Sequence, residues 1–305
     1  MEKNWRLILD QKDKGYCNMA KDEAILRMYP YQKIPTLRIY GWSNPWVSLG
    51  CNQKIEDVLK MPTDVPFVRR ITGGAAILHD QEVTYSISCS QSDLNLPSSV
   101  KEAYRIICSF LKFFYCQLGL KAEFAVDFLK RGNNLYSLGE NSIFGGNHSI
   151  SKSEVLGGGE KTADFGSRGF TLDRQEIFCF SAWQKFDLLV NGKKIGGNAQ
   201  RRTKDAIFQH GSIPQKIDFS KVKKTIKKSF DSFKRAGFLD YFLKKTTDFS
   251  SLACYLKDAF QMTFKIKLIE GKLTVQEEHV CQNLIDEKYS KEDWNVGRNK
   301  TKMAE

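Results

Sequence analysis

The chain has 305 residues, of which 41% are hydrophobic, enough to bury the core of one large domain or two ordinary ones. It has no run of eighteen apolar residues, and the polar start MEKNWRLILDQKDKG is unlike a signal peptide, so we expect a cytoplasmic protein. The net charge of +12, partly from residues 220–235, favours an acidic partner. Charge alone does not distinguish among nucleic acid, an anionic membrane and an acidic protein.

The eight cysteines are scattered, with no CxxC pair and no histidine at zinc-ligand spacing. A disulfide framework is not expected in a reducing compartment. We therefore expect most of the cysteines to be buried as small apolar side chains. Cys179 raises a separate question, because it precedes a predicted strand, turn and strand and is either a reactive nucleophile or a core residue.

The first part of the chain contains predicted helices at both ends of a group of predicted strands. Apolar residues recur at helical spacing in residues 17–27. The clearest helix is residues 98–118, with Ser98 or Ser99 as its cap and Gly119 after its end. Between the two helices, β-branched and aromatic residues predict strands at 36–42, 46–51, 67–72 and 83–88.

The middle of the chain changes character at residues 131–169, which carry nine glycines and many Ser and Asn residues. This composition predicts a mobile loop or insertion. Beyond it, Asn191-Gly192 between two short runs is a strong hairpin signal. Residues 206–212 then predict a further strand.

The last part of the chain is predicted to be mostly helical from residue 219, with a possible hairpin at 263–273 and a disordered tail at 296–305. Strands early and helices late, without regular strand–helix–strand alternation, predict an α+β fold. We expect one domain over residues 1–295, with its core at about 30–270.

The stretch RRITGGAAILHD is the first candidate for a functional motif. Gly73 and Gly74 would let the backbone approach a ligand closely. Arg69 or Arg70 could hold an anionic group, and His79 could orient a loop by hydrogen bonding. A plain turn with solvated charges would explain the same residues.

The second candidate is NGKKIGGNAQRR, in which Lys194 lies on a predicted strand before two glycines. Its ammonium group could point at an acyl carbonyl or promote the ionisation of a nearby thiol. Antiparallel strands that start near 179 and end near 197 would bring Cys179 within reach. Spacing alone favours the alternatives, an exposed hairpin lysine and a cysteine packed in the core.

Together these stretches resemble the lipoate-protein ligase and octanoyltransferase superfamily, which also contains biotin-protein ligases. The resemblance covers roughly residues 5–295 and rests on CNMAKDEAIL, YGWSNPWVSLGCNQ, RRITGGAAILHDQEVTYS, CFSAWQKFDLLVNGKKIGGNAQRR, FQHGSIP and KYSKEDWN. It implies a catalytic domain of the biotin/lipoyl-protein ligase type, with a mixed or antiparallel sheet, flanking helices and a monomeric state.

Within the superfamily the chain is most similar to the cysteine-dependent octanoyltransferases, in which a CF dipeptide precedes the strand leading to the lysine. This resemblance implies that Cys179 forms an acyl thioester and that Lys194, fifteen residues later, activates it. It also implies a substrate-binding role for a set of residues in the two motifs: Arg70, Gly73, Gly74, Ala75, His79, Gly197, Asn198 and Ala199.

The resemblance further implies an octanoyl-acyl carrier protein as donor, and a lipoyl-domain protein or glycine cleavage H protein as acceptor. Both kinds of partner are typically acidic, which suits the charge of +12. It implies no metal or nucleotide cofactor, no nucleic acid and no membrane.

Three alternatives remain open from the sequence. An ATP-dependent lipoate or octanoate ligase would use Lys194 and the glycine loop and would not need Cys179. An amidotransferase would move octanoyl groups between lipoyl-domain proteins through the same cysteine. A basic adaptor would bind nucleic acid on its C-terminal helices. The motif TGGAA, where many ligases carry a third glycine, leaves the choice of acyl substrate open.

Overall fold

The computed structural model describes residues 3–137, 177–180, 183–227 and 235–297. The insertion predicted at 131–169 and the tail predicted at 296–305 fall mostly outside these residues, and the structure describes only the first part of each. The proposed limits of the domain stay predictions.

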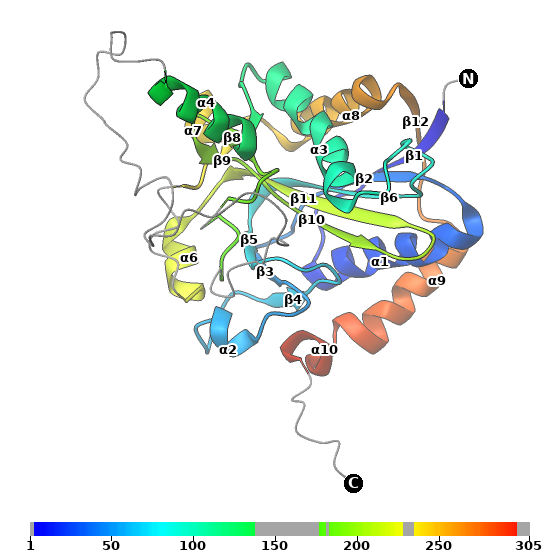
Figure 1. The fold of residues 1–305 in the computed structure, drawn as a ribbon. Coiled ribbons are helices and arrows are strands. Elements are labelled where there is room, and N and C mark those ends of the chain that lie inside the picture. Colours follow the sequence, from blue (N-terminus) through cyan, green and yellow to red (C-terminus); the bar gives the residue numbers. More distant parts are fainter. Residues whose placement is uncertain (1–2, 138–176, 181–182, 228–234, 298–305) are drawn as a thin grey trace.

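A mixed sheet of six strands forms the centre of the molecule, in the order β10-β11-β6-β2-β1-β12 (Figure 1). β1 runs parallel to both of its neighbours, and the other neighbouring strands are antiparallel. The α+β fold with a mixed sheet is therefore confirmed. The strands are β1 (Lys3–Leu9), β2 (Thr36–Tyr40), β6 (Gln81–Cys89), β10 (Gly197–Arg202), β11 (Ile207–Lys216) and β12 (Ile266–Glu270).

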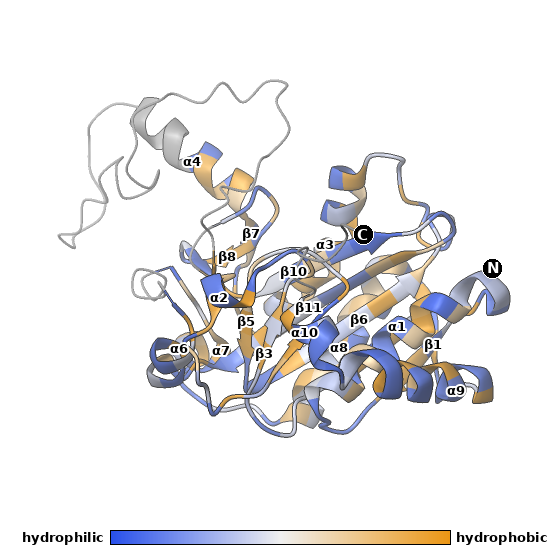
Figure 2. Ribbon diagram, turned by 90° about the horizontal axis from the view of Figure 1, so that it is seen from below, coloured by the Kyte–Doolittle hydropathy of each residue, from blue (hydrophilic) through white to orange (hydrophobic). Residues whose placement is uncertain are grey.

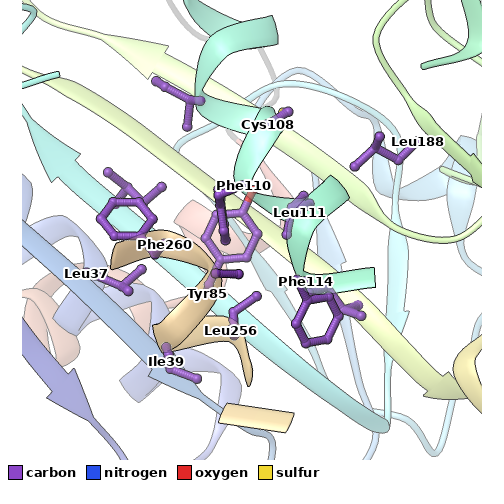
Figure 3. Packing of buried hydrophobic residues seen from close by; sticks show 14 of the residues in the cluster. Leu37, Ile39, Tyr85, Cys108, Phe110, Leu111, Phe114, Leu188, Leu256 and Phe260 are labelled. Carbon is purple, nitrogen blue, oxygen red and sulfur yellow. The ribbon is translucent and has the colours of Figure 1, made fainter. Parts of the chain in front are cut away.

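Helices α3 (Val100–Gln117) and α8 (Phe249–Phe264) cover one face of this sheet (Figure 1). Leu37 and Ile39 lie two residues apart on β2, so both side chains point to that face. Figure 3 shows them beside Tyr85 of β6, Phe110 of α3 and Phe260 of α8, all of which are buried. This apolar layer is the larger part of the hydrophobic core.

Helices α1 (Gly15–Gln32) and α9 (Val275–Leu284) cover the opposite face. Their apolar residues pack with Tyr40, Trp42 and Phe208 in a second cluster. Most of α9 is hydrophilic in Figure 2, and Cys281 and Leu284 are among its few buried residues. The helix therefore packs by one side only, as an amphipathic surface helix does.

Two sheets of three strands each complete the fold, in the orders β4-β3-β5 and β7-β8-β9. Their strands are β3 (Trp46–Leu49), β4 (Phe67–Arg69), β5 (Ile77–His79), β7 (Glu123–Phe124), β8 (Leu188–Val190) and β9 (Lys193–Lys194). The remaining helical segments are α2 (Ile55–Val58), α4 (Ala125–Ser137), α6 (Phe219–Thr225), α7 (Leu239–Leu243), the π-helical turn η2 (Ile285–Tyr289) and α10 (Glu292–Val296). In the part of the chain described here, none of the helices has the length and apolar character needed to cross a membrane.

The local signals that predicted α3 and the β8–β9 hairpin are confirmed. The Ser99 hydroxyl accepts the backbone N–H of Glu102 at the start of α3, and Gly119 has a φ of 76° just after its end. Asn191 and Gly192 have φ values of 48° and 74°, which is the left-handed conformation that a tight hairpin turn requires.

At the two ends of the chain the structure adds one strand and corrects one prediction. The first residues form β1, for which we made no prediction from the sequence. The hairpin expected at 263–273 is instead the end of α8 followed by the single strand β12, which pairs in parallel with β1. Each strand finds its partner at the other end of the chain, so no local turn signal could have revealed the pairing.

A buried ion pair connects α1 to the sheet. The Arg38 guanidinium is fully buried and lies 2.7 Å from a carboxylate oxygen of both Asp22 and Asp10. Asp22 also accepts the hydroxyls of Tyr40, at 2.8 Å, and Ser86, at 2.7 Å. Burial opposes ionisation of Asp22, but the charge of Arg38 and the hydrogen bonds of His210 and Ser86 keep its pKa below the ordinary value.

We predict that Asp22→Ala lowers the free energy of unfolding by about 3–5 kcal/mol, because it leaves a buried guanidinium with less compensation. Urea unfolding near pH 7 measures the difference. The exposed Asp205→Ala is the matched control, expected to change stability by less than about 0.5 kcal/mol. Similar losses in both variants would show that the buried pair adds no specific stability.

Candidate active site

A cavity of about 250 Å³ lies between the six-stranded sheet and the β4-β3-β5 sheet. Gly197, Ser212, Thr84 and Tyr40 line it from β10, β11, β6 and β2, where they are paired in one row across the strands. Adjacent strands are about 4.8 Å apart, so the row is about 14 Å long. The cavity is therefore elongated across the strands.

Cys179 lies at the Gly197 end of this row. The backbone of residues 177–179 runs beside Ala76, with Ala76 N–H donating to Ile177 at 3.0 Å and Cys179 N–H donating to Ala76 at 2.9 Å. A Cβ atom on Gly197 would come within 2.8 Å of the Cys179 sulfur. Glycine is therefore needed at position 197 for the sulfur to occupy its place.

The pairing predicted for Cys179 is wrong, although its predicted neighbour is right. Residue 178 forms a parallel bridge with Ala76, so Cys179 is not on an antiparallel strand leading to Lys194. Lys194 nevertheless reaches the thiol from β9, and hydrogen bonding to Cys179 contributes to its pKa.

Lys194 is buried, so the reading of it as an exposed hairpin lysine is wrong. Its ammonium nitrogen lies 2.7 Å from the carboxylate of Asp187, which is also buried. Burial by itself would lower the pKa of Lys194, but the charges and hydrogen bonds of Asp187 and Cys179 outweigh it and raise the pKa. Lys194 is thus a stable cation beside the thiol.

Arg70 is a second buried cation at the cavity. Its guanidinium donates to the carbonyl oxygens of Gly73, at 2.8 Å, and Ala75, at 2.9 Å, and so shapes the glycine loop. Burial lowers its pKa to about 10, and the charge of Cys179 acts in the opposite direction. Among the residues that the structure describes, no carboxylate forms an ion pair with Arg70.

Arg69, the alternative to Arg70 in the sequence reading, lies outside the cavity. Its guanidinium donates to carbonyl oxygens of Gly50 and Gln53 on one side, and of Trp294 and Asn295 on the other. It therefore ties the chain near α10 to the loop after β3. Its role is structural.

His79 and Trp42 form another part of the cavity wall. Their rings are stacked at a centroid distance of 3.9 Å. His79 Nδ1 lies 2.8 Å from the buried carboxylate of Glu82, which also accepts the Ser212 hydroxyl at 2.8 Å. These polar groups satisfy one another, so the wall presents few unpaired polar atoms to a ligand.

All the expected site residues except Gly73 line the cavity, and the structure brings them together from separate elements. The Asn198 side chain lies on the far side of β10, where its oxygen accepts the Tyr85 hydroxyl at 2.8 Å. The sequence reading missed Trp42, Asp187 and Glu82. Asp187 lies in the FDLLV run, directly before β8, and no feature of the sequence marked it as a partner of Lys194.

The eight cysteines do not follow the prediction that most would be buried. Cys89, Cys108 and Cys281 are buried, whereas Cys116 and Cys254 are exposed and Cys17, Cys51 and Cys179 are half-buried. Burial raises the pKa of Cys108 to about 12 and that of Cys281 to about 11. These two thiols are therefore inert at neutral pH.

Residues 14–261 match the family model of the lipoyl protein ligase A/B catalytic domain. The octanoyltransferase LipM of Geobacillus kaustophilus is 33% identical, over 96% of this chain and 98% of that protein. Octanoyltransferase LipM of Bacillus cereus is 31% identical, over 93% of this chain and 96% of that protein.

The solved structure of protein Ta0514 from T. acidophilum with bound lipoic acid superposes with a TM-score of 0.70. It is 23% identical and covers 97% of this chain and 100% of its own. That level of identity supports the fold, and the family model supports membership over most of the chain. The protein therefore belongs to the lipoyl protein ligase A/B catalytic domain family.

Proposed function

We propose that the protein is an octanoyltransferase of protein lipoylation and that it works through a thioester on Cys179. The reaction type is that of the relatives named octanoyltransferase LipM. The observation that carries the mechanism is the position of Cys179, which lies at the end of an elongated cavity beside Lys194 and Arg70.

The first step forms a bond between the Cys179 sulfur and the carbonyl carbon of an octanoyl thioester. The bond from that carbon to the donor sulfur breaks, and the donor leaves as a thiolate that takes up a proton. The charge of Lys194 favours the thiolate form of Cys179 and can hold the carbonyl oxygen as it becomes negative.

In the second step, the amine of an acceptor lysine attacks the Cys179 thioester. A carbon–nitrogen bond forms and the carbon–sulfur bond breaks, with the electron pair going to sulfur. The proton lost from nitrogen balances the thiolate, so Cys179 returns as a thiol and the acceptor carries an octanoyl amide.

The cavity suits an unbranched acyl chain that starts at Cys179. The row from Gly197 to Tyr40 runs away from the sulfur, and Ile77, Phe178 and Trp42 add apolar surface to its walls. Each buried methylene group contributes about 0.8 kcal/mol. The apolar walls of the cavity would hold the acyl chain and leave its carbonyl group beside Lys194.

We assign octanoyl-acyl carrier protein as the donor and a lipoyl-domain or glycine cleavage H protein as the acceptor. Both kinds of partner are typically acidic, and the net charge of +12 would attract them. A cytoplasmic location and a monomeric state complete the proposal.

Intact-mass spectrometry after mixing with octanoyl-acyl carrier protein, without ATP, tests the nucleophile. We predict one added octanoyl group on the wild type, labile to hydroxylamine, and none on Cys179→Ala. Cys51→Ala is the matched control, because Cys51 is also half-buried and, like Cys179, tends to raise the pKa of Arg70. This control should acquire the adduct like the wild type.

No adduct on any of the three proteins would remove Cys179 from the mechanism. Octanoylation of a lipoyl domain that required ATP and persisted in Cys179→Ala would identify the ATP-dependent ligase instead. An adduct gained from an octanoylated lipoyl-domain protein but not from the carrier protein would identify the amidotransferase.

Gly197→Ala tests whether the Cys179 sulfur must lie at its observed position beside Gly197 in order to react. Its Cβ atom would lie 2.8 Å from the Cys179 sulfur and 3.2 Å from the Ile77 Cδ1 atom, so the thiol must move. We predict that acylation slows by at least about tenfold, because small displacements of a nucleophile are costly. Circular dichroism should show the folded protein. Acylation at the wild-type rate would mean that the sulfur reacts from another position.

A further inference from the structure

Asp187 is the one carboxylate in contact with Lys194 among the residues described, and the mechanism above does not use it. Both side chains are almost fully buried, with 3% of Asp187 and 4% of Lys194 exposed. The Asp187 Oδ2 atom lies 2.7 Å from the Lys194 nitrogen and also accepts the backbone N–H of Gln184 at 2.7 Å. Two hydrogen bonds thus converge on one carboxylate oxygen.

The charge of Cys179 changes during the proposed reaction, and that of Asp187 does not. In the free enzyme the Cys179 thiolate can compensate the Lys194 ammonium. In the acyl-enzyme the sulfur is part of a neutral thioester, so this compensation is gone. A buried lysine without an anion loses its proton readily, because burial disfavours the charged form.

We propose that Asp187 is a positioning residue that keeps Lys194 protonated and directed at the thioester while Cys179 carries the acyl group. Lys194 is then a cation in both half-reactions. It is needed in the second, because the departing sulfur takes an electron pair and becomes negative. This inference rests on the proposed function and concerns the half-reaction that follows thioester formation.

Within the described part of the chain, the other titratable groups that act on the pair or on Cys179 do not replace this role. Arg70 faces Cys179, and Tyr104 and Cys108 of α3 face Asp187. Burial raises the pKa of Cys108 to about 12 and that of Tyr104 well above its ordinary value, so both stay neutral from pH 6 to 9. Arg70 stays charged over the same range, because its pKa is about 10.

Asp187→Asn is a sharp test because both hydrogen bonds end on one oxygen. The amide oxygen can occupy the place of Oδ2 and accept from Gln184 and Lys194, so the variant removes the charge and keeps the shape. The acyl-enzyme is prepared first, and its transfer to a lipoyl domain is then timed from pH 6 to 9.

We expect thioester formation at pH 7 to stay within about threefold of the wild type, because the thiolate itself compensates Lys194 at that stage. The transfer rate should match the wild type at pH 6 and fall behind it by at least about tenfold at pH 9, as Lys194 loses its proton. A wild-type to variant ratio that does not change with pH would overturn the inference, whatever its size.

Lys194→Arg supplies the matched background, since a guanidinium stays charged without a partner. In that background Asp187→Asn should give a pH-independent ratio. The exposed Asp205→Asn, which changes the net charge equally, should transfer like the wild type at every pH. If Lys194→Arg does not fold, the pH profiles of Asp187→Asn and Asp205→Asn still decide whether Asp187 keeps Lys194 protonated.

Failure of this inference can be told from failure of the proposed function. A wild type that forms no thioester on Cys179 removes the proposed function. A wild type that forms and transfers it, beside an Asp187→Asn variant with a parallel pH profile, removes only the role of Asp187.

Discussion

Lys194 and Arg70 are buried at the cavity and Arg38 is buried behind its lining residue Tyr40, and the low dielectric of the interior requires that each of these cations be compensated. Arg38 is held by Asp22 and Asp10, and Lys194 by Asp187. Arg70 is held by neutral acceptors, including the carbonyl oxygens of the glycine loop. The first two pairs are permanent, whereas the charge of Arg70 remains available to an anion that enters the cavity or forms within it.

The same cavity depends on two close approaches that glycine alone permits. A Cβ atom on Gly197 would collide with the Cys179 sulfur, and one on Gly50 would lie 2.0 Å from the carbonyl oxygen of Gly74. The first contact places the thiol over β10, and the second packs the glycine loop against the end of β3. The sulfur therefore lies against the backbone of β10 and the loop against the end of β3, and the Arg70 side chain holds the loop by hydrogen bonds.

Local sequence signals correctly predicted the elements that depend on residues close together in the chain. The cap at Ser99 and the Asn191-Gly192 turn act within a few residues, and both are confirmed. The pairing of β1 with β12 joins the two ends of the chain, and the bridge from residue 178 to Ala76 crosses about a hundred residues. Such pairings depend on tertiary packing, which short-range patterns do not encode.

The site residues were predicted from the motifs and from the family resemblance, but their electrostatic partners were not. A buried lysine needs an anion, yet the sequence offers many aspartates and no rule that singles out Asp187. The predicted mechanism named a lysine that acts by its charge. In the proposed mechanism this charge persists when the thiolate is consumed, because the countercharge lies on Asp187, which takes no part in bond formation. In that mechanism Cys179 alternates between anion and thioester, so the buried ammonium of Lys194 would need a fixed countercharge whatever acyl chain fills the cavity.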